Sequence, residues 1–118
     1  MKYLCLVYHD EKQPDALPAR EYDALVRDTL AYDEELRQSG HYVTSNALQY
    51  VQTATTVRVR GGTVSITDGP FAETEEQLGG FILIEARDLN EAIRVASGMP
   101  PGRLGSIEVR PIKEFDPR

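Results

Sequence analysis

Two segments of the chain are apolar on both of the faces that a β-strand presents. In residues 3–8 and again in residues 81–86, nearly every side chain is apolar, so neither alternating set is polar. A strand with one solvated face alternates between apolar and polar residues, whereas a strand covered on both faces does not. The pattern therefore predicts two strands that are covered on both sides.

A third region has the alternation of a β-hairpin. Residues 55–60 and 63–67 flank the pair Gly61-Gly62, and glycine tolerates the positive φ angles that a two-residue turn needs. A shift of the strand pairing by one residue would turn the apolar side chains to the other face. The predicted register pairs Val59 with Val64 and Val57 with Ile66 on one face, and Arg58 with Ser65 on the other.

Two helices with recognisable ends are predicted. The first begins at Pro18, because proline suits the first helical position, and it stops at Ser39-Gly40. The second begins at the capping box of residues 88–91 and ends at Gly98 and the prolines after it. The side chains expected to be buried are Tyr22, Leu25, Val26, Thr29, Leu30 and Leu36 in the first helix, and Leu89, Ala92, Ile93 and Ala96 in the second.

With further strands expected at residues 41–48 and 105–112, the order becomes β-α-β-β-β-β-α-β. If the hairpin is an extension, the remainder is the split βαβ pattern of one α+β domain spanning residues 1–118. Two helices can cover only one face of such a sheet, so something else must cover the second apolar face. We expect a second copy of the chain, in an isologous homodimer. The alternative is a monomer whose open face forms a ligand groove.

Charge and composition narrow the choice of partners. The 118 residues include 19 acidic and 13 basic side chains, a net charge of −6, which disfavours a nucleic-acid-binding surface but not docking on a basic protein. Cys5 is the one cysteine, so no internal disulfide is possible, and this suits a cytoplasmic location. The apolar start is too short for a secretory signal, and no run approaches the ~18 apolar residues of a membrane span.

The most distinctive connection covers residues 68–81 and carries candidate chemistry. Connections in compact domains are usually about 4–6 residues long, and longer ones often hold binding or catalytic groups. Asp68 starts this segment, and it either caps its own turn before Gly69-Pro70 or supplies a functional carboxylate. Phe71 either plugs an interface or contacts a ligand. Gly79-Gly80 lacks the lysine of a phosphate loop, so it more simply permits close approach of another backbone.

His9 is the candidate acid/base group, because it follows the first strand directly and imidazole titrates near neutral pH. A solvated loop histidine is the plainer interpretation. Tyr8 and His41 could line a cleft as substrate-binding residues, or could equally be part of a sheet surface. Cys5 is expected to be a core residue. Only two histidines exist and no ligand spacing matches a metal motif, so neither a metal nor a cofactor is expected.

Several motifs together resemble the DGPF proteins of the YCII-related family. The resemblance covers nearly the whole chain, and the long central motif is specific. The matching stretches are Met1-Lys2-Tyr3, Tyr8-His9-Asp10, Gly40-His41-Tyr42, Ala47-Leu48, Asp68-Gly69-Pro70-Phe71, Glu76-Gln77-Leu78-Gly79-Gly80-Phe81, Ile84-Glu85-Ala86-Arg87-Asp88 and Gly105-Ser106-Ile107-Glu108-Val109-Arg110-Pro111.

This resemblance implies a ferredoxin-like α+β domain that dimerises sheet against sheet as a dimeric α/β barrel. It implies a bacterial, cytoplasmic protein, in a family often encoded beside extracytoplasmic-function sigma factors. It also implies a paired histidine and aspartate facing a cleft, here His9 and Asp68. Three functions follow: a lyase or isomerase that transfers protons on an unidentified small molecule, a non-catalytic ligand-binding or regulatory module linked to a sigma factor, or a dimer with a vestigial cleft.

Overall fold

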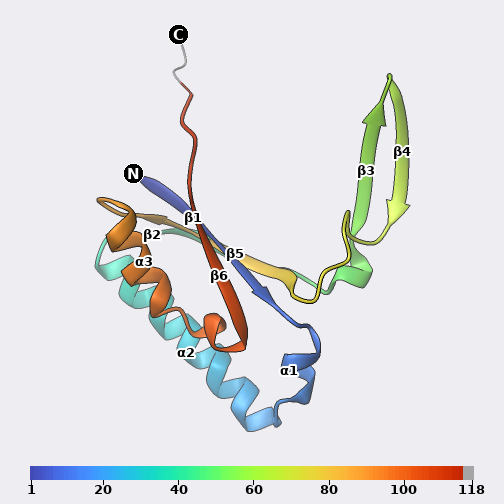
Figure 1. Cartoon of the computed structure of the whole chain (residues 1–118). Coiled ribbons are helices and arrows are strands. Elements are labelled where there is room, and N and C mark those ends of the chain that lie inside the picture. Colours follow the sequence, from blue (N-terminus) through green and yellow to red (C-terminus); the bar gives the residue numbers. More distant parts are fainter. Residues whose placement is uncertain (116–118) are drawn as a thin grey trace.

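A computed structural model describes residues 1–115 as a four-stranded antiparallel sheet with helices on one face and a separate hairpin (Figure 1). The sheet has the order β2-β5-β1-β6, as expected for a ferredoxin-like split βαβ arrangement. Its strands are β1 (Lys2–His9), β2 (Tyr42–Ala47), β5 (Gln77–Glu85) and β6 (Gly105–Pro111). The helices are α1 (Lys12–Ala16), α2 (Ala19–Gln38) and α3 (Leu89–Ser97), with short 3₁₀ turns at Val51–Thr53 and Pro100–Leu104. The mixed α+β class predicted from the sequence is confirmed.

The strand register separates the side chains of β1 into two sets. Cys5 lies opposite both Ile82 of β5 and Val109 of β6, and this face packs against the helices. The core on that face contains Tyr3, Cys5, Val7, Leu36, Ile82, Ile84, Ala86, Ala92, Val95, Ala96 and Met99. The opposite face, called the open face below, includes Leu4, Leu6, Tyr8, Leu78, Phe81 and Leu83. Within the single chain, this second apolar face is only half-buried.

The two long helices end where the sequence predicts. Ser39 is the C-cap of α2, and Asp88 caps α3 by accepting a hydrogen bond of 2.9 Å from the Glu91 N–H. Their buried faces differ from the prediction. In α2 only Asp33 and Leu36 are buried, while Tyr22, Val26 and Leu30 are exposed, because the first half of the helix borders an open cavity rather than the packed core.

The buried face of α3 also differs from the one predicted. It consists of Glu91, Ala92, Val95 and Ala96, whereas Leu89 and Ile93 are about half exposed. The apolar residues of this helix spread over more than one stripe, and its angle on the sheet decides which of them the core accepts.

Two connections between the predicted strands and helices contain regular structure. The segment after β1 includes the short helix α1, and β5 begins at Gln77 instead of residue 81. The earlier start of β5 includes a register irregularity opposite Val7 and Tyr8, since Val7 pairs with Gly80 and Tyr8 with Leu78. The two glycines thus lie inside the strand, where the absence of side chains allows the bulge.

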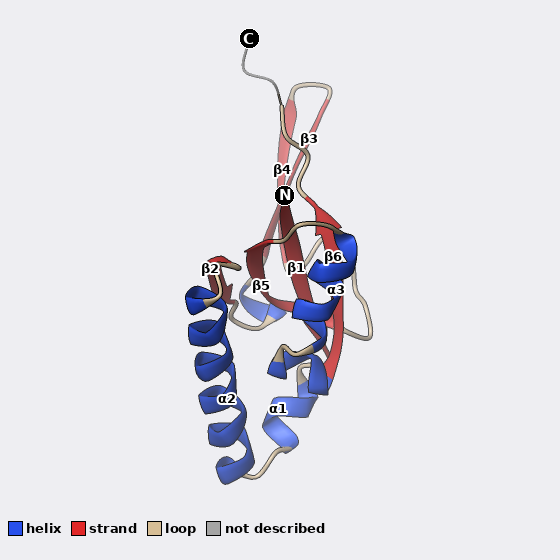
Figure 2. Cartoon of the chain, turned by 90° about the vertical axis from the view of Figure 1, so that its left-hand side faces the viewer, coloured by secondary structure: helices blue, strands red, loops and turns tan. Residues whose placement is uncertain are grey.

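The hairpin has the predicted register and forms a sheet of its own. Strands β3 (Thr55–Arg60) and β4 (Thr63–Asp68) pair Val59 with Val64 and Val57 with Ile66. The turn glycines Gly61 and Gly62 have φ angles of 56° and 79°, which explains their presence there. The hairpin stands clear of the body in Figure 1, and its tip projects beyond the sheet in Figure 2.

Among residues 1–115, no helix combines the length and the apolar character needed to cross a membrane.

Candidate functional site

The candidate site is an open cavity of about 460 Å³ between residues 22–33 of α2 and the sheet. It lies at the end of the sheet where His9, Gln77, Ala47 and Gly105 meet, called the His9 end below. The wall is largely apolar and is formed mainly by Val7, Tyr22, Leu25, Val26, Leu30, Leu48, Ile82 and Leu104. Its ionisable side chains other than tyrosine are His9 and Asp33, and no Lys or Arg is among the described residues that line it.

His9 enters this cavity because of its place in β1. Val7 and His9 share the helix-facing side of the strand, whereas Tyr8 between them faces the other way. The imidazole ring packs directly on the backbone of Gly79, where an added Cβ would lie 2.3 Å from the ring atom Cε1. Gly105, on the other neighbouring strand, leaves similar room beside the His9 backbone. Gly79, which belongs to the long sequence motif, thus leaves the space that the His9 ring occupies.

Hydrogen bonds hold the segment that follows His9. The Glu11 N–H donates to Gln77 Oε1 at 3.0 Å, and the Glu11 carboxylate accepts from the Val51 N–H at 2.9 Å. The Tyr50 hydroxyl donates to Asp15 at 2.9 Å. These bonds connect the α1 region to the chain that leads into the hairpin, so they fix one wall of the cavity.

Asp33 is the second ionisable group of the cavity. It sits on α2 and is only 8% exposed. Burial raises the pKa of this carboxyl above its usual value, while Arg37 and Ser45 act in the opposite direction. A buried carboxyl with a raised pKa, in a cavity that a histidine also lines, is a typical setting for acid/base chemistry.

Asp33 is not among the site residues that the sequence motifs predict, although the sequence holds a signal for it. The residue lies four positions after Thr29 and three before Leu36, which places it on the inward stripe of the helix. A carboxylate on an apolar stripe is unusual, because a buried charge costs free energy unless it is compensated. The break in the apolar stripe is therefore the feature of the sequence that marks Asp33.

Asp68 and Phe71 lie elsewhere, at the base of the hairpin. No hydrogen bond or ion pair of the described residues joins Asp68 to His9, and Asp68 does not line the cavity. Its turn is held by the Gly69 N–H, which donates to the Ala54 carbonyl at 2.7 Å, and by the Thr56 hydroxyl, which donates to the Gly69 carbonyl. Phe71 is 80% exposed. The pairing of His9 with Asp68 therefore stays a prediction.

Tyr8 lies on the open face of the sheet, where it lines a separate hollow at the base of the hairpin together with Phe71. Its neighbour His9 points to the opposite face. Adjacent residues of a strand cannot line the same face, which sequence adjacency alone does not reveal.

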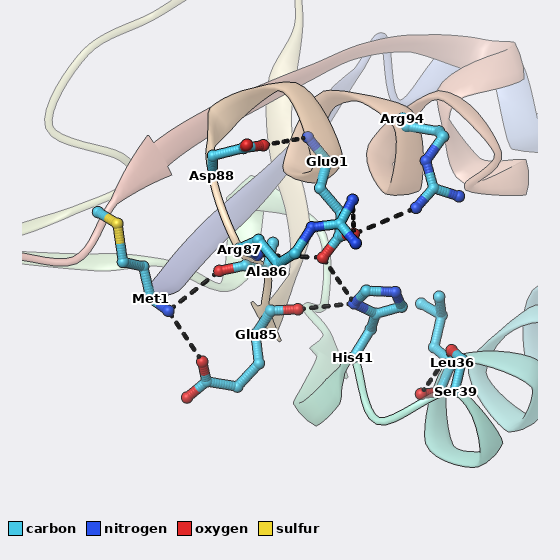
Figure 3. A network of polar contacts seen from close by, with 10 residues as sticks. All are labelled: Met1, Leu36, Ser39, His41, Glu85, Ala86, Arg87, Asp88, Glu91 and Arg94. Carbon is cyan, nitrogen blue, oxygen red and sulfur yellow. Dashed lines mark hydrogen bonds and ion pairs between the residues drawn. The ribbon is translucent and has the colours of Figure 1, made fainter.

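His41 lies at the far end of the sheet, beside the first turn of α3 (Figure 3). Its Nδ1 is 2.8 Å from the Glu85 carbonyl and 3.9 Å from the Glu91 carboxylate. Glu91 also accepts from the Arg87 N–H and forms ion pairs with Arg87 and Arg94. The Arg87 hydrogen bond, aided by the surrounding cations, lowers the pKa of Glu91. This network fastens α3 to the sheet.

Cys5 is fully buried, and desolvation raises the pKa of its thiol to about 11. A thiol in this state is a poor nucleophile, so the predicted core role fits the structure. Among residues 1–115, no group of three or more His, Cys, Asp and Glu side chains is arranged to hold a metal ion.

Comparison with known proteins decides the family. A sequence profile of the YCII-related domain matches residues 1–116. The chain belongs to the YCII-related family. An uncharacterised protein of Rhizobium meliloti (strain 1021) is 35% identical over 119 residues, covering 99% of this chain and 96% of that protein.

A solved structure shares the fold. It is that of 5-chloro-2-hydroxyhydroquinone dehydrochlorinase from Burkholderia phenoliruptrix AC1100 in complex with 2,5-dihydroxybenzoquinone. The TM-score is 0.56 over 98% of this chain and 96% of that one, with 15% sequence identity. At this identity the similarity establishes the fold of this YCII-related protein and nothing about its substrate.

Proposed function

We propose that this protein is a small-molecule enzyme that transfers protons in the cavity at the His9 end of the sheet. The observation that carries the proposal is that the cavity contains one imidazole and one buried carboxyl, from β1 and α2, within a largely apolar wall. Apolar pockets with a few convergent polar groups are the usual form of small-molecule sites, which measure about 300–1,000 Å³.

In this proposal His9 removes a proton from a hydroxyl or carbon of the substrate. Asp33 is the second proton carrier, since burial raises its pKa and brings it closer to neutral pH. Such a pair serves a lyase or an isomerase, in which a proton leaves one atom and a proton returns to the departing group or to a neighbouring atom. Asp68 is the alternative carboxylate, and its role would require that ligand binding bring its side chain close to His9.

The chemistry of the wall suggests a class of substrate. With no Lys or Arg among the described residues along the cavity, a phosphorylated or polyanionic compound would lack a counter-charge. Apolar side chains with Tyr22 and Tyr50 suit a small ring compound that carries hydroxyl groups. The structural neighbour was solved with a dihydroxybenzoquinone, which supports testing this class first.

The test begins with binding and continues to turnover. Hydroxylated benzoquinones and hydroquinones, starting with 2,5-dihydroxybenzoquinone, are titrated into the protein while the NMR signals of His9 and Asp33 are followed. Compounds that bind are then assayed for chemical change. We expect His9→Ala and Asp33→Asn to lower kcat by at least about 100-fold, the usual contribution of a positioned acid or base.

Asp68→Asn is the matched control, because it makes the same change at the other candidate carboxylate. If Asp68→Asn removes turnover while Asp33→Asn does not, the pairing of His9 with Asp68 is correct and the role of Asp33 is wrong. If His9→Ala retains full turnover, neither assignment survives.

The alternative is a non-catalytic ligand-binding or regulatory module that associates with an extracytoplasmic-function sigma factor. It uses the same cavity, and it predicts saturable binding with no chemical change in the bound compound. The acidic net charge of −6 suits a basic protein partner. Co-purification at low salt with an extracytoplasmic-function sigma factor tests that association, and its absence removes the sigma factor from the proposal.

We also propose that the chain forms a homodimer by packing its open face against that of a second copy, as in a dimeric α/β barrel. The motivation is that Leu4, Leu6 and Leu83 are only half-buried in one chain. Leu6→Asp is expected to produce a monomer in sedimentation experiments. A Leu6→Asp protein that remains dimeric contradicts sheet-to-sheet packing.

A further inference from the structure

The hairpin of β3 and β4, called the arm below, has one apolar and one polar face. Val57, Val59, Val64 and Ile66 share a face and are 58–69% exposed. Arg58, Ser65 and the threonines beside them occupy the other face. An isolated two-stranded hairpin is marginally stable in water. When one face of the hairpin is entirely apolar, we expect another surface to cover that face.

The dimensions of the chain agree with an arm that its own body does not cover. The radius of gyration is 16.4 Å, whereas a compact chain of this length has a radius of about 13.5 Å. The accessible surface is 8401 Å², against about 6,400 Å² for a typical monomer of this mass. The excess of about 2,000 Å² exceeds the roughly 800 Å² that each partner of a standard complex buries.

The apolar face of the arm continues into the open face of the sheet. A hollow of about 990 Å³ at the base of the arm is lined by Val57 of the arm and by Tyr8 and Leu78 of the sheet. Phe71, which is 80% exposed, lies in the same hollow. Figure 1 shows the arm rising from the side of the sheet opposite to the helices. The open face of the sheet and the apolar face of the arm therefore adjoin each other, so that one partner can cover both.

The charges of the arm and the body are complementary. The arm, residues 55–68, contains Arg58, Arg60 and one acidic side chain, Asp68, so it carries +1. Because the whole chain carries −6, the remainder carries −7. A positively charged arm is attracted to a negatively charged body, and the body of a second copy has this property.

We propose that the arm reaches across a dimer interface and packs its apolar face against a second copy of this chain, an inference that rests on the open-face homodimer proposed above. Strands of six residues extend about 20 Å, and two stacked sheets lie about 10 Å apart. An arm of this length is long enough to extend past the sheet of a partner chain that packs on the open face. By two-fold symmetry the partner's arm makes the same contact in return, so both apolar surfaces of both chains are covered.

The first test measures dimerisation of the full chain by sedimentation across a concentration series. Val64→Asp places a charge on the apolar face of the arm, and Ser65→Asp places the same charge on the adjacent residue of the polar face. We expect Val64→Asp to raise the dimer dissociation constant at least tenfold, while Ser65→Asp leaves it within about threefold of the wild type. Ile66→Thr, which retains β propensity, guards against an unfolded arm and should weaken the dimer in the same direction.

The second test identifies what the arm touches. Thr63→Cys near the tip is labelled with a photo-crosslinker, and Cys5 does not compete because it is buried. Labelled and isotopically heavy unlabelled chains are mixed, and the crosslinks are located by mass spectrometry. Crosslinks between light and heavy chains are expected. A wild type that stays monomeric at about 100 µM, crosslinks confined to one chain, or equal dissociation constants for Val64→Asp and wild type would each overturn the proposal.

Discussion

Substitution of Gly79 by alanine tests whether the glycine in β5 seats the catalytic candidate His9. The added Cβ would lie 2.3 Å from His9 Cε1 and 2.8 Å from Nδ1. Ordinary contact begins at 3.4 Å, so the ring must retreat by about 1 Å relative to Gly79. The imidazole is the far end of a side chain and can rotate, which makes its displacement easier than movement of the strand.

The free-energy cost of this change is small because two effects oppose each other. A side chain forced about 30° from its preferred rotamer costs about 0.5–1.5 kcal/mol. Replacing glycine by alanine at a compatible backbone position contributes about 0.4–1 kcal/mol of stability by restricting the unfolded chain. Gly79 does not have a positive φ angle, so its backbone accepts alanine. We expect the free energy of unfolding to change by less than about 1 kcal/mol.

The decisive measurement is therefore the position of the His9 ring and not the stability of the fold. His9 and His41 are the only histidines, so their ring signals can be assigned in the NMR spectrum with a His41→Gln variant. Gly79→Ala should shift the His9 ring signal and leave that of His41 unchanged. Turnover, once a substrate is known, should fall with the displacement of the ring.

Gly102→Ala is the matched control, because its added Cβ meets only the flexible end of Ile107, at 3.1 Å. It should leave the His9 signal in place. If the His9 ring signal of Gly79→Ala superimposes on that of the wild type, the ring does not pack on Gly79 and the explanation of the glycine motif is wrong.

Three further predictions concern titratable groups. Asp33→Asn should not destabilise the fold at pH 7, because the raised pKa of Asp33 means that its ionised form opposes folding. A decrease of more than about 1 kcal/mol in the free energy of unfolding, measured by chemical denaturation, would contradict this. The pKa of Glu91 is lowered, so its stabilising contribution is present above the ordinary glutamate pKa and is lost as the pH falls through the lowered value. Glu91→Gln should therefore flatten the decline of stability below about pH 4.5. An unchanged dependence of stability on acid pH would count against the network. Cys5 should resist thiol reagents at pH 8 in the native protein and react fully once unfolded; rapid native labelling would show that its strand is open.

Much of the fold follows from local patterns in the sequence. The hairpin register was predictable because Gly61-Gly62 specifies the turn and the alternation of valines specifies the face. The cap of α3 was predictable because Asp88 and Glu91 are three positions apart. In β6, alternation places Ile107 and Val109 on one face of the strand, and both pack against the core.

The site was less predictable, because it depends on which side chains share a face. Sequence pointed to His9, and the structure places it in a cavity. It also suggested Tyr8 as a companion, although neighbouring residues of β1 face opposite ways. The signature Asp68-Gly69-Pro70-Phe71 drew attention to Asp68, yet the carboxyl that shares the cavity with His9 comes from α2.

The sequence by itself determined the order of the elements, the turn of the hairpin, the caps of α3 and the family, because each depends on residues close together in the chain or on a contiguous motif. Only the tertiary structure decided that Asp33 accompanies His9, that Gly79 makes room for the imidazole and that the arm stands apart with its apolar face uncovered. Those features arise where β1, α2 and β5 meet, and the distance between such segments is set by packing and not by their spacing in sequence.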